Sequence, residues 1–149
     1  MKGNAKIMAI ILLLLVLSGC QSSGYRAINT SEYRDVRNNY DVTFGWNLKS
    51  VQDGLLLDGF ARNNRYFIIN ELALIVAVVS PDGAEKVRRS LLVHPSEIRL
   101  NESAGFSVAL PVKLQQGDSL RYIYNYRAVE NAEEGFFWMN SFDSPARTE

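Results

Sequence analysis

The chain of 149 residues has only one cysteine and one histidine. This scarcity excludes a disulfide framework, a thiol redox pair and a metal site built from clustered Cys and His. An excess of charge is also absent, because 16 Lys and Arg are balanced by 16 Asp and Glu. Binding to nucleic acid by bulk positive charge is therefore excluded. With 47% hydrophobic residues, the composition predicts one globular domain rather than a disordered chain.

The amino terminus has the pattern of a secretory signal peptide. Lys2 and Lys6 supply positive charge, and the run from Ile7 to Leu17 is wholly apolar. A helix of this length would cover roughly 17 Å, at about 1.5 Å per residue, of a hydrocarbon core near 30 Å. The run is therefore too short to span a bilayer.

Directly after this run come Leu17, Ser18, Gly19 and Cys20, a sequence that resembles the lipobox of bacterial lipoproteins. The resemblance implies diacylglyceryl transfer to the Cys20 sulfur, cleavage after Gly19 and acylation of the new terminal amine. A secretory signal followed by an unrelated cysteine is the alternative. Two or three acyl chains would anchor the protein durably, so we expect a membrane-anchored protein of the cell envelope.

The residue after the cysteine indicates to which membrane the lipoprotein would be sorted. In the lipoprotein family an Asp at this position commonly retains the protein at the inner membrane, but here Gln21 follows Cys20. The resemblance therefore implies the periplasmic face of an outer membrane, if the source has two membranes.

The signal peptide (1–19) is followed by a polar segment, 20–39, that we interpret as the lipidated N-terminus and a flexible tether. No apolar period is sustained in it, and Ser, Gly and Asn interrupt it. When extended at about 3.3 Å per residue, this tether would reach roughly 60 Å. Tyr25, Tyr33 and Val36 could still hold part of it against the folded domain, 40–149.

Alternation with a period of two begins after Tyr40. In residues 42–48, apolar side chains occupy every second position, as in a strand with one buried face. Asp53 and Gly54 predict a hairpin turn, and Gly59 predicts a bulge or a close approach of backbone. The other predicted strands are separated by turn residues and cover 55–61, 66–79, 87–93, 106–110, 120–127 and 136–142.

About seven short strands and almost no helix predict an all-β fold, a single antiparallel β-sandwich. The order of turns and strands is similar to the small immunoglobulin-like domains of bacterial envelope proteins, including the FxLYD and fibronectin type III groups. Asp118, Leu120 and Tyr122 also resemble the corner at which an immunoglobulin-like domain ties a loop with a tyrosine hydroxyl. Without the cysteine pair of antibody domains, the core must hold by packing alone.

The candidate catalytic residues do not form a catalytic pattern. His94 would have to serve in any Ser-His-Asp triad, but no serine lies in a Gly-x-Ser-x-Gly elbow. The acidic candidates suit a solvated loop, turns and exposed faces: Glu130, Glu133, Glu134, Asp53 and Asp58. We therefore predict no enzymatic activity, no cofactor and no metal site.

Two groups of side chains are candidates for binding. Phe136, Phe137 and Trp138 are consecutive, so in a strand at least one of them points away from the core. Exposed aromatic rings can stack on sugars or anchor a protein interface, but the tether or a loop could equally cover them. Four arginines could form a positive stripe or the solvated face of an edge strand: Arg88, Arg89, Arg121 and Arg127.

Together these features favour a non-catalytic envelope lipoprotein. Its domain would act as a structural or protein-interaction module, possible partners being other proteins of an envelope assembly. The alternative is a module that binds carbohydrate or peptidoglycan through Trp138 and neighbouring tyrosines.

Replacing Cys20 by Ser tests the lipid anchor. The substitution changes size and polarity little but removes the sulfur nucleophile that would receive diacylglycerol. Metabolic labelling with a fatty-acid analogue is expected to mark the wild-type chain and not Cys20→Ser. The domain is expected to fold in both, because Cys20 lies outside the alternating pattern. Label on the variant would contradict the lipobox assignment.

Overall fold

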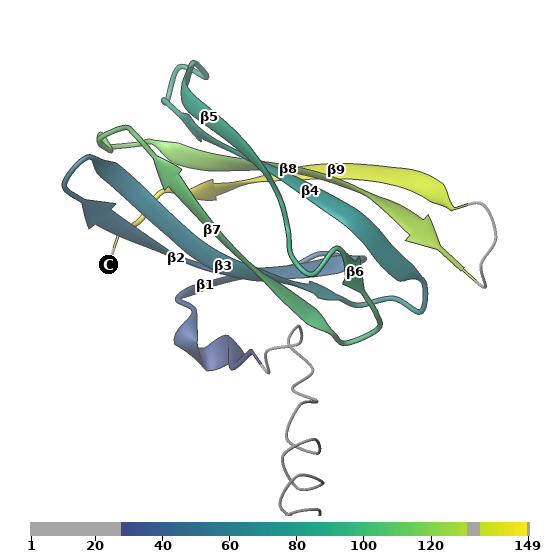
Figure 1. The fold of residues 1–149 in the computed structure, drawn as a ribbon. Coiled ribbons are helices and arrows are strands. Elements are labelled where there is room, and N and C mark those ends of the chain that lie inside the picture. The colour runs from purple at the N-terminus through teal and green to yellow at the C-terminus, as the bar shows by residue number, and fades with distance from the viewer. Residues whose placement is uncertain (1–27, 131–134, 149) are drawn as a thin grey trace, which may run out of the picture.

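The computed structural model describes residues 28–130 and 135–148, whose strands form two antiparallel sheets packed face to face (Figure 1). Sheet A has the strand order β1 (Asp35–Asn38), β2 (Val42–Val51), β3 (Gly54–Asn63) and β7 (Ser103–Leu110). Sheet B has the order β5 (Glu85–Leu92), β4 (Ile68–Val79), β8 (Ser119–Val129) and β9 (Phe136–Pro145). The short strand β6 (Glu97–Ile98) also pairs with β4, and a 3-10 turn, η1 (Thr30–Glu32), precedes β1.

The predicted immunoglobulin-like β-sandwich is confirmed. The seven strands expected from the sequence correspond to β2, β3, β4, β5, β7, β8 and β9. The chain passes between the sheets after β3, after β6 and after β7, so that β3 pairs with β7 and β4 pairs with β8. The described chain has two further strands, β1 and β6, which are too short to show a clear alternation in the sequence.

The hairpin between β2 and β3 lies one residue earlier than predicted. Val51 pairs with Gly54, so Gln52 and Asp53 form the turn. Gly54 has a φ of 142°, and a Cβ there would lie 2.3 Å from the carbonyl oxygen of Leu110. Glycine is therefore required at position 54 by its close contact with the end of β7 as well as by its backbone conformation.

Aromatic side chains from both inner faces make the core. The ring centroids of Phe44 and Tyr124 are 4.9 Å apart, and those of Trp46 and Tyr122 are 4.8 Å apart. Phe142 lies parallel to Tyr122, with centroids 4.7 Å apart. Each such pair contributes about 0.5–1.5 kcal/mol beyond the area that it buries. These contacts join β2 of sheet A to β8 and β9 of sheet B.

The predicted tyrosine corner at Tyr122 is wrong. Its side chain points between the sheets, where its buried hydroxyl has no hydrogen-bond partner among the described residues. The loop before β8 is held by Asp118 instead. The Asp118 carboxylate accepts a hydrogen bond from the backbone N–H of Gln115 at 2.7 Å and another from Lys86 Nζ. Lys86 and this N–H hold the pKa of Asp118 below its usual value.

The segment that forms η1 and β1 packs on sheet A, although the sequence places it in the flexible tether. The ring of Tyr33 lies 4.8 Å from the ring of Phe60, on the outer face of the sheet. The side chain of Asn47 donates to the carbonyl of Glu32 and accepts from the N–H of Arg34, both at 2.8 Å. Of the three residues proposed for that role, Tyr33 holds this segment against the domain, Val36 is exposed, and Tyr25 lies outside the described residues.

The signal peptide, Cys20 and the beginning of the tether lie outside the described residues. Within the residues that the structure describes, no helix is long and apolar enough to cross a membrane.

Glycines allow aromatic rings to lie flat on the sheet. A Cβ on Gly59 would come within 2.4 Å of the Phe106 ring, which confirms the predicted close approach, here to a side chain. On the outer face, Phe60 lies between Gly45 and Gly105 in register. A Cβ on Gly45 would lie 2.2 Å from the Phe60 ring, whereas the nearest atom to a Cβ on Gly105 is 3.8 Å away.

This asymmetry predicts opposite results for two alanine variants. Gly45→Ala is expected to lower the free energy of unfolding by about 1–3 kcal/mol, because the added methyl displaces Phe60. Gly105→Ala is the matched control and is expected to be neutral or stabilising by up to about 1 kcal/mol. Urea unfolding of the two purified variants measures both effects, and equal destabilisation would contradict the placement of Phe60.

Candidate functional site

The first four residues of β9 expose large hydrophobic side chains on both faces of the strand. Phe136 is 52% exposed and Trp138 40%, while Phe137 and Met139 are 80% and 73% exposed. Successive side chains of a strand point to opposite faces. Phe136 and Trp138 therefore lie on the inner side, together with the buried Phe142, and Phe137 and Met139 lie on the outer face of sheet B. The described chain does not cover this segment.

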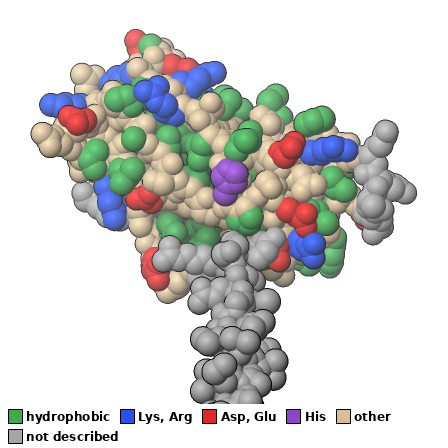
Figure 2. All heavy atoms as spheres, viewed as in Figure 1, with side chains coloured by type: hydrophobic (Ala, Val, Ile, Leu, Met, Phe, Trp, Pro, Cys, Tyr) green, Lys and Arg blue, Asp and Glu red, His purple; other side chains and the backbone are tan. Residues whose placement is uncertain are grey.

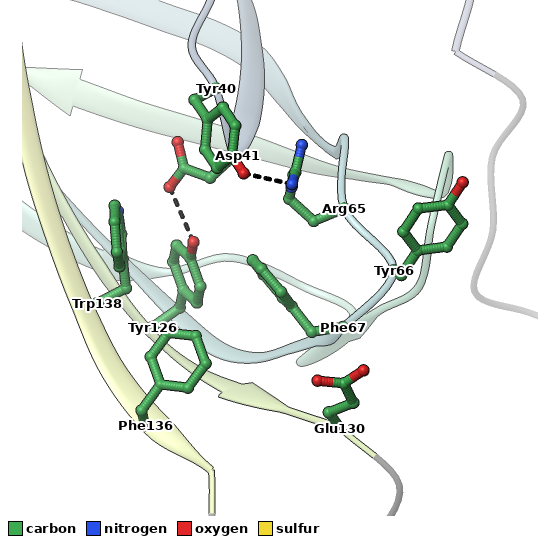
Figure 3. A pocket seen from close by; sticks show the side chains of 9 residues that line it. All are labelled: Tyr40, Asp41, Arg65, Tyr66, Phe67, Tyr126, Glu130, Phe136 and Trp138. Atoms are coloured by element: carbon green, nitrogen blue, oxygen red, sulfur yellow. Dashed lines mark hydrogen bonds between the residues drawn. The ribbon is translucent and has the colours of Figure 1, made fainter.

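β8 and β9 run past the end of sheet A (Figure 1). Side chains of these strands and of two loops line a pocket there. The inner side of the two strands, which would otherwise face the opposite sheet, meets the loop before β2 and the loop before β4. The pocket has a volume of about 410 Å³. We call it the aromatic pocket; its lining is Tyr40, Asp41, Arg65, Tyr66, Phe67, Tyr126, Glu130, Phe136 and Trp138 (Figure 3).

The rings in the aromatic pocket do not form a flat platform. Phe136 meets Trp138 at 71° and Phe67 at 75°, with centroid distances of 6.4 and 6.0 Å. Phe67 and Tyr126 are closer to parallel, at 26°. Ring faces and ring edges thus alternate around the pocket. This shape suits a compact group enclosed by rings better than a sugar ring stacked on one flat surface.

The Asp41 carboxylate lies at the border of the pocket and connects the two sheets. Its two oxygens accept hydrogen bonds from the hydroxyls of Tyr124 at 2.7 Å and Tyr126 at 2.8 Å. Asp41 directly precedes β2 of sheet A, whereas both tyrosines belong to β8 of sheet B. Asp41 is only 1% exposed, yet it forms no ion pair with any residue in the described part of the chain.

The two tyrosines are neutral donors to this carboxylate. Burial is the main cause that raises the pKa of Tyr124 and of Tyr126 well above the usual value, and the hydrogen bond to Asp41 and its negative charge add to it. Their rings are parallel within 9°. Burial also raises the pKa of Tyr122.

Arg65 lies against another ring of the pocket. Its guanidinium carbon is 3.8 Å from the centroid of the Tyr40 ring, and Nη2 donates a hydrogen bond to the Tyr40 hydroxyl (Figure 3). Arg65 therefore places a positive charge on the face of an exposed aromatic side chain, which is a cation–π contact.

β9 is also an edge strand with little charge. It pairs with β8 on one side, and no described strand pairs with its other side. One of its ten residues is charged, Asp143, compared with four of eight in β5 at the opposite edge of the sheet. Charged side chains on an edge strand discourage pairing with other chains. β5 has this protection, and the first half of β9 does not.

The predicted positive stripe is only partly assembled. Arg88 and Arg121 lie in register on either side of β4. Each is paired with a carboxylate, because Arg88 contacts Glu85 and Arg121 contacts Asp143. The other two arginines of the predicted stripe lie apart from this pair: Arg89 and Arg127. The stripe is thus an ion-paired, solvated face.

The other candidate residues are dispersed. His94 is exposed (Figure 2). Its backbone pairs with Gly105. Asp53 lies in the exposed turn after β2, and Asp58 lies within β3. Glu133 and Glu134 lie outside the described residues, whereas Glu130 lines the aromatic pocket. Among residues 28–130 and 135–148, no group of three or more His, Cys, Asp or Glu could hold a metal ion.

No protein-family model matches the chain, and a search of the curated proteins finds no match. The chemistry of the pocket has to be inferred from its own side chains.

Among the pocket residues that the sequence does not single out are Tyr40, Asp41 and Arg65. Tyr40 and Asp41 lie between the polar segment and the first predicted strand, and Arg65 lies in a predicted turn. Only the pairing of the strands brings them beside Trp138. One sequence signal could have pointed to this site, namely an acidic residue, Asp41, directly before an apolar strand. Asp41 is buried because tyrosines cover it.

The raised pKa values predict how the domain responds to alkali. The phenols of Tyr122, Tyr124 and Tyr126 are favoured as neutral groups in the folded state, so the stability they contribute is present below about pH 10, the usual tyrosine value. It is lost as the pH rises further. Tyrosinate absorbance from these three is expected to appear together with loss of near-ultraviolet circular dichroism. Ionisation of all tyrosines before unfolding would contradict this.

Proposed function

We propose that the chain is a non-catalytic, lipid-anchored protein of the cell envelope whose sandwich binds a protein partner along β9. The observation that carries the proposal is the exposure of large hydrophobic side chains on both faces of an unpaired edge strand. Of the four exposed hydrophobic side chains of β9, a ligand in the aromatic pocket would cover only Phe136 and Trp138. A protein that covers the edge would also bury Phe137 and Met139.

Strand addition is the mode of binding that this edge supports. An extended segment of the partner would pair with the free N–H and C=O groups of β9 and add a strand to the edge of sheet B. The main-chain hydrogen bonds would supply affinity. Side chains of the added segment would alternate between the aromatic pocket and the outer face, and these contacts would supply specificity.

The location of the interaction rests on the lipobox. Acylation at Cys20 would hold the domain at a membrane, and Gln21 after it favours the periplasmic face of an outer membrane where the source has two. The partner would then be another envelope protein, and the chain an accessory of an envelope assembly.

Carbohydrate or peptidoglycan binding is the second candidate. Six of the nine residues that line the aromatic pocket are aromatic, and two carry carboxylates that could accept hydrogen bonds from sugar hydroxyls. The steep angles between Trp138, Phe136 and Phe67 disfavour it, because sugar rings stack on exposed ring faces. It also leaves the exposure of Phe137 and Met139 without a role.

Photocrosslinking in intact producing cells tests the proposed interface. A photoreactive amino acid at Phe137 or at Met139 is expected to crosslink the same envelope protein. The control position is Val51, which is also an exposed hydrophobic residue but lies at the end of β2. Phe137→Asp is expected to reduce the crosslink formed from position 139 severalfold.

The proposal fails if the β9 positions give no protein crosslink, or the same products as Val51. Crosslinks to glycan strands in place of protein would favour the carbohydrate candidate.

A further inference from the structure

The charges around the aromatic pocket have a net negative sum. Asp41 and Glu130 each contribute a carboxylate and Arg65 contributes one guanidinium, which leaves one negative charge in excess. The Asp41 charge is the more consequential, because it is buried and has no cationic partner in the described chain. A buried carboxylate is costly to hold unless hydrogen bonds or an opposite charge compensate it.

The compensation that Asp41 receives is incomplete. Each of its oxygens accepts one tyrosine hydroxyl, and a carboxylate oxygen can accept two hydrogen bonds. Neutral hydroxyls satisfy hydrogen bonding without cancelling the charge. A cation that entered the pocket would supply the missing opposite charge.

The aromatic rings of the pocket would also attract a cation, in addition to the Asp41 carboxylate. The negative face of an aromatic ring attracts a cation within about 6 Å, and several rings together form a cage. Arg65 shows that a guanidinium is accommodated at the border of this pocket, since it lies 3.8 Å from the centre of the Tyr40 ring. The rings of Tyr126, Phe136 and Trp138 face the remaining space (Figure 3).

We propose that the aromatic pocket binds a lysine or arginine side chain of the segment that pairs with β9. This inference rests on the proposed function in one respect, namely that the cation belongs to a protein. The preference for a cation is argued from the pocket residues alone. In a strand added to β9, every second residue points to the side of Phe136 and Trp138. The long apolar stem of a lysine or arginine would pack on these rings while its charged end lies near Asp41.

Fluorescence reports binding in this pocket directly. Trp46 is buried in the core and Trp138 lines the pocket, so a ligand there perturbs Trp138. The full chain in an uncharged detergent is titrated with N-acetyl-lysine methylamide and with the neutral norleucine analogue. The lysine probe is expected to bind at least about fivefold more tightly, and added salt is expected to weaken it.

Variants at three charged residues give the inference its sharpest test. Arg65→Gln removes the competing cation and is expected to strengthen binding of the lysine probe severalfold. Asp41→Asn and Glu130→Gln each remove a negative charge and are expected to weaken it. Glu130 is exposed, so its variant remains informative if Asp41→Asn fails to fold. Val51→Ala, at the exposed end of β2 and outside the pocket lining, is the control and is expected to leave binding unchanged.

Equal binding of the lysine and norleucine probes would overturn the inference, as would weaker binding of the lysine probe to Arg65→Gln. Preferential binding of an N-acetylglucosamine oligomer would overturn it in favour of the carbohydrate candidate. These titrations use no partner protein. The crosslinks from Phe137 and Met139 therefore test the proposed interface independently of the preference for a cation.

Discussion

The two sheets are held together by side-chain packing across their inner faces, without a disulfide bond between them, and every other feature depends on that packing. Phe44 and Trp46 of β2 lie against the tyrosines of β8, and Phe142 extends the stack to β9. At the end of this stack, Asp41 continues the contact in polar form by accepting two tyrosine hydroxyls. The same contacts that join the sheets therefore fix the position of the loop that borders the aromatic pocket.

Most of the fold could be predicted because burial imposes a period of two. The alternation of Leu120, Tyr122, Tyr124 and Tyr126 predicts one buried face, and all four side chains are buried. Strands shorter than one or two periods give no such signal, which is why β1 and β6 were not expected. β1 is held by long-range contacts, namely its pairing with β2 and the packing of Tyr33 on Phe60.

The candidate site was predictable in part. Three consecutive aromatic residues in a strand must include at least one that leaves the core, and Phe136, Phe137 and Trp138 are all partly or largely exposed. The residues opposite them were not predictable, because Asp41 and Arg65 reach the pocket only through the pairing of distant strands. The sequence also did not predict which tyrosines of β8 donate hydrogen bonds to Asp41. Tyr124 and Tyr126 bind Asp41 because they lie nearer the open end of the sandwich, whereas Tyr122 lies deeper, against Trp46.

The packing of Tyr33 on the outer face of sheet A also limits how far an anchored domain could lie from the membrane. If the chain is acylated at Cys20, the ten residues 20–29 before η1 span at most roughly 35 Å. This is little more than half the reach of a tether that runs to Asn39. In that case the domain would meet only partners that lie within this distance of the same membrane.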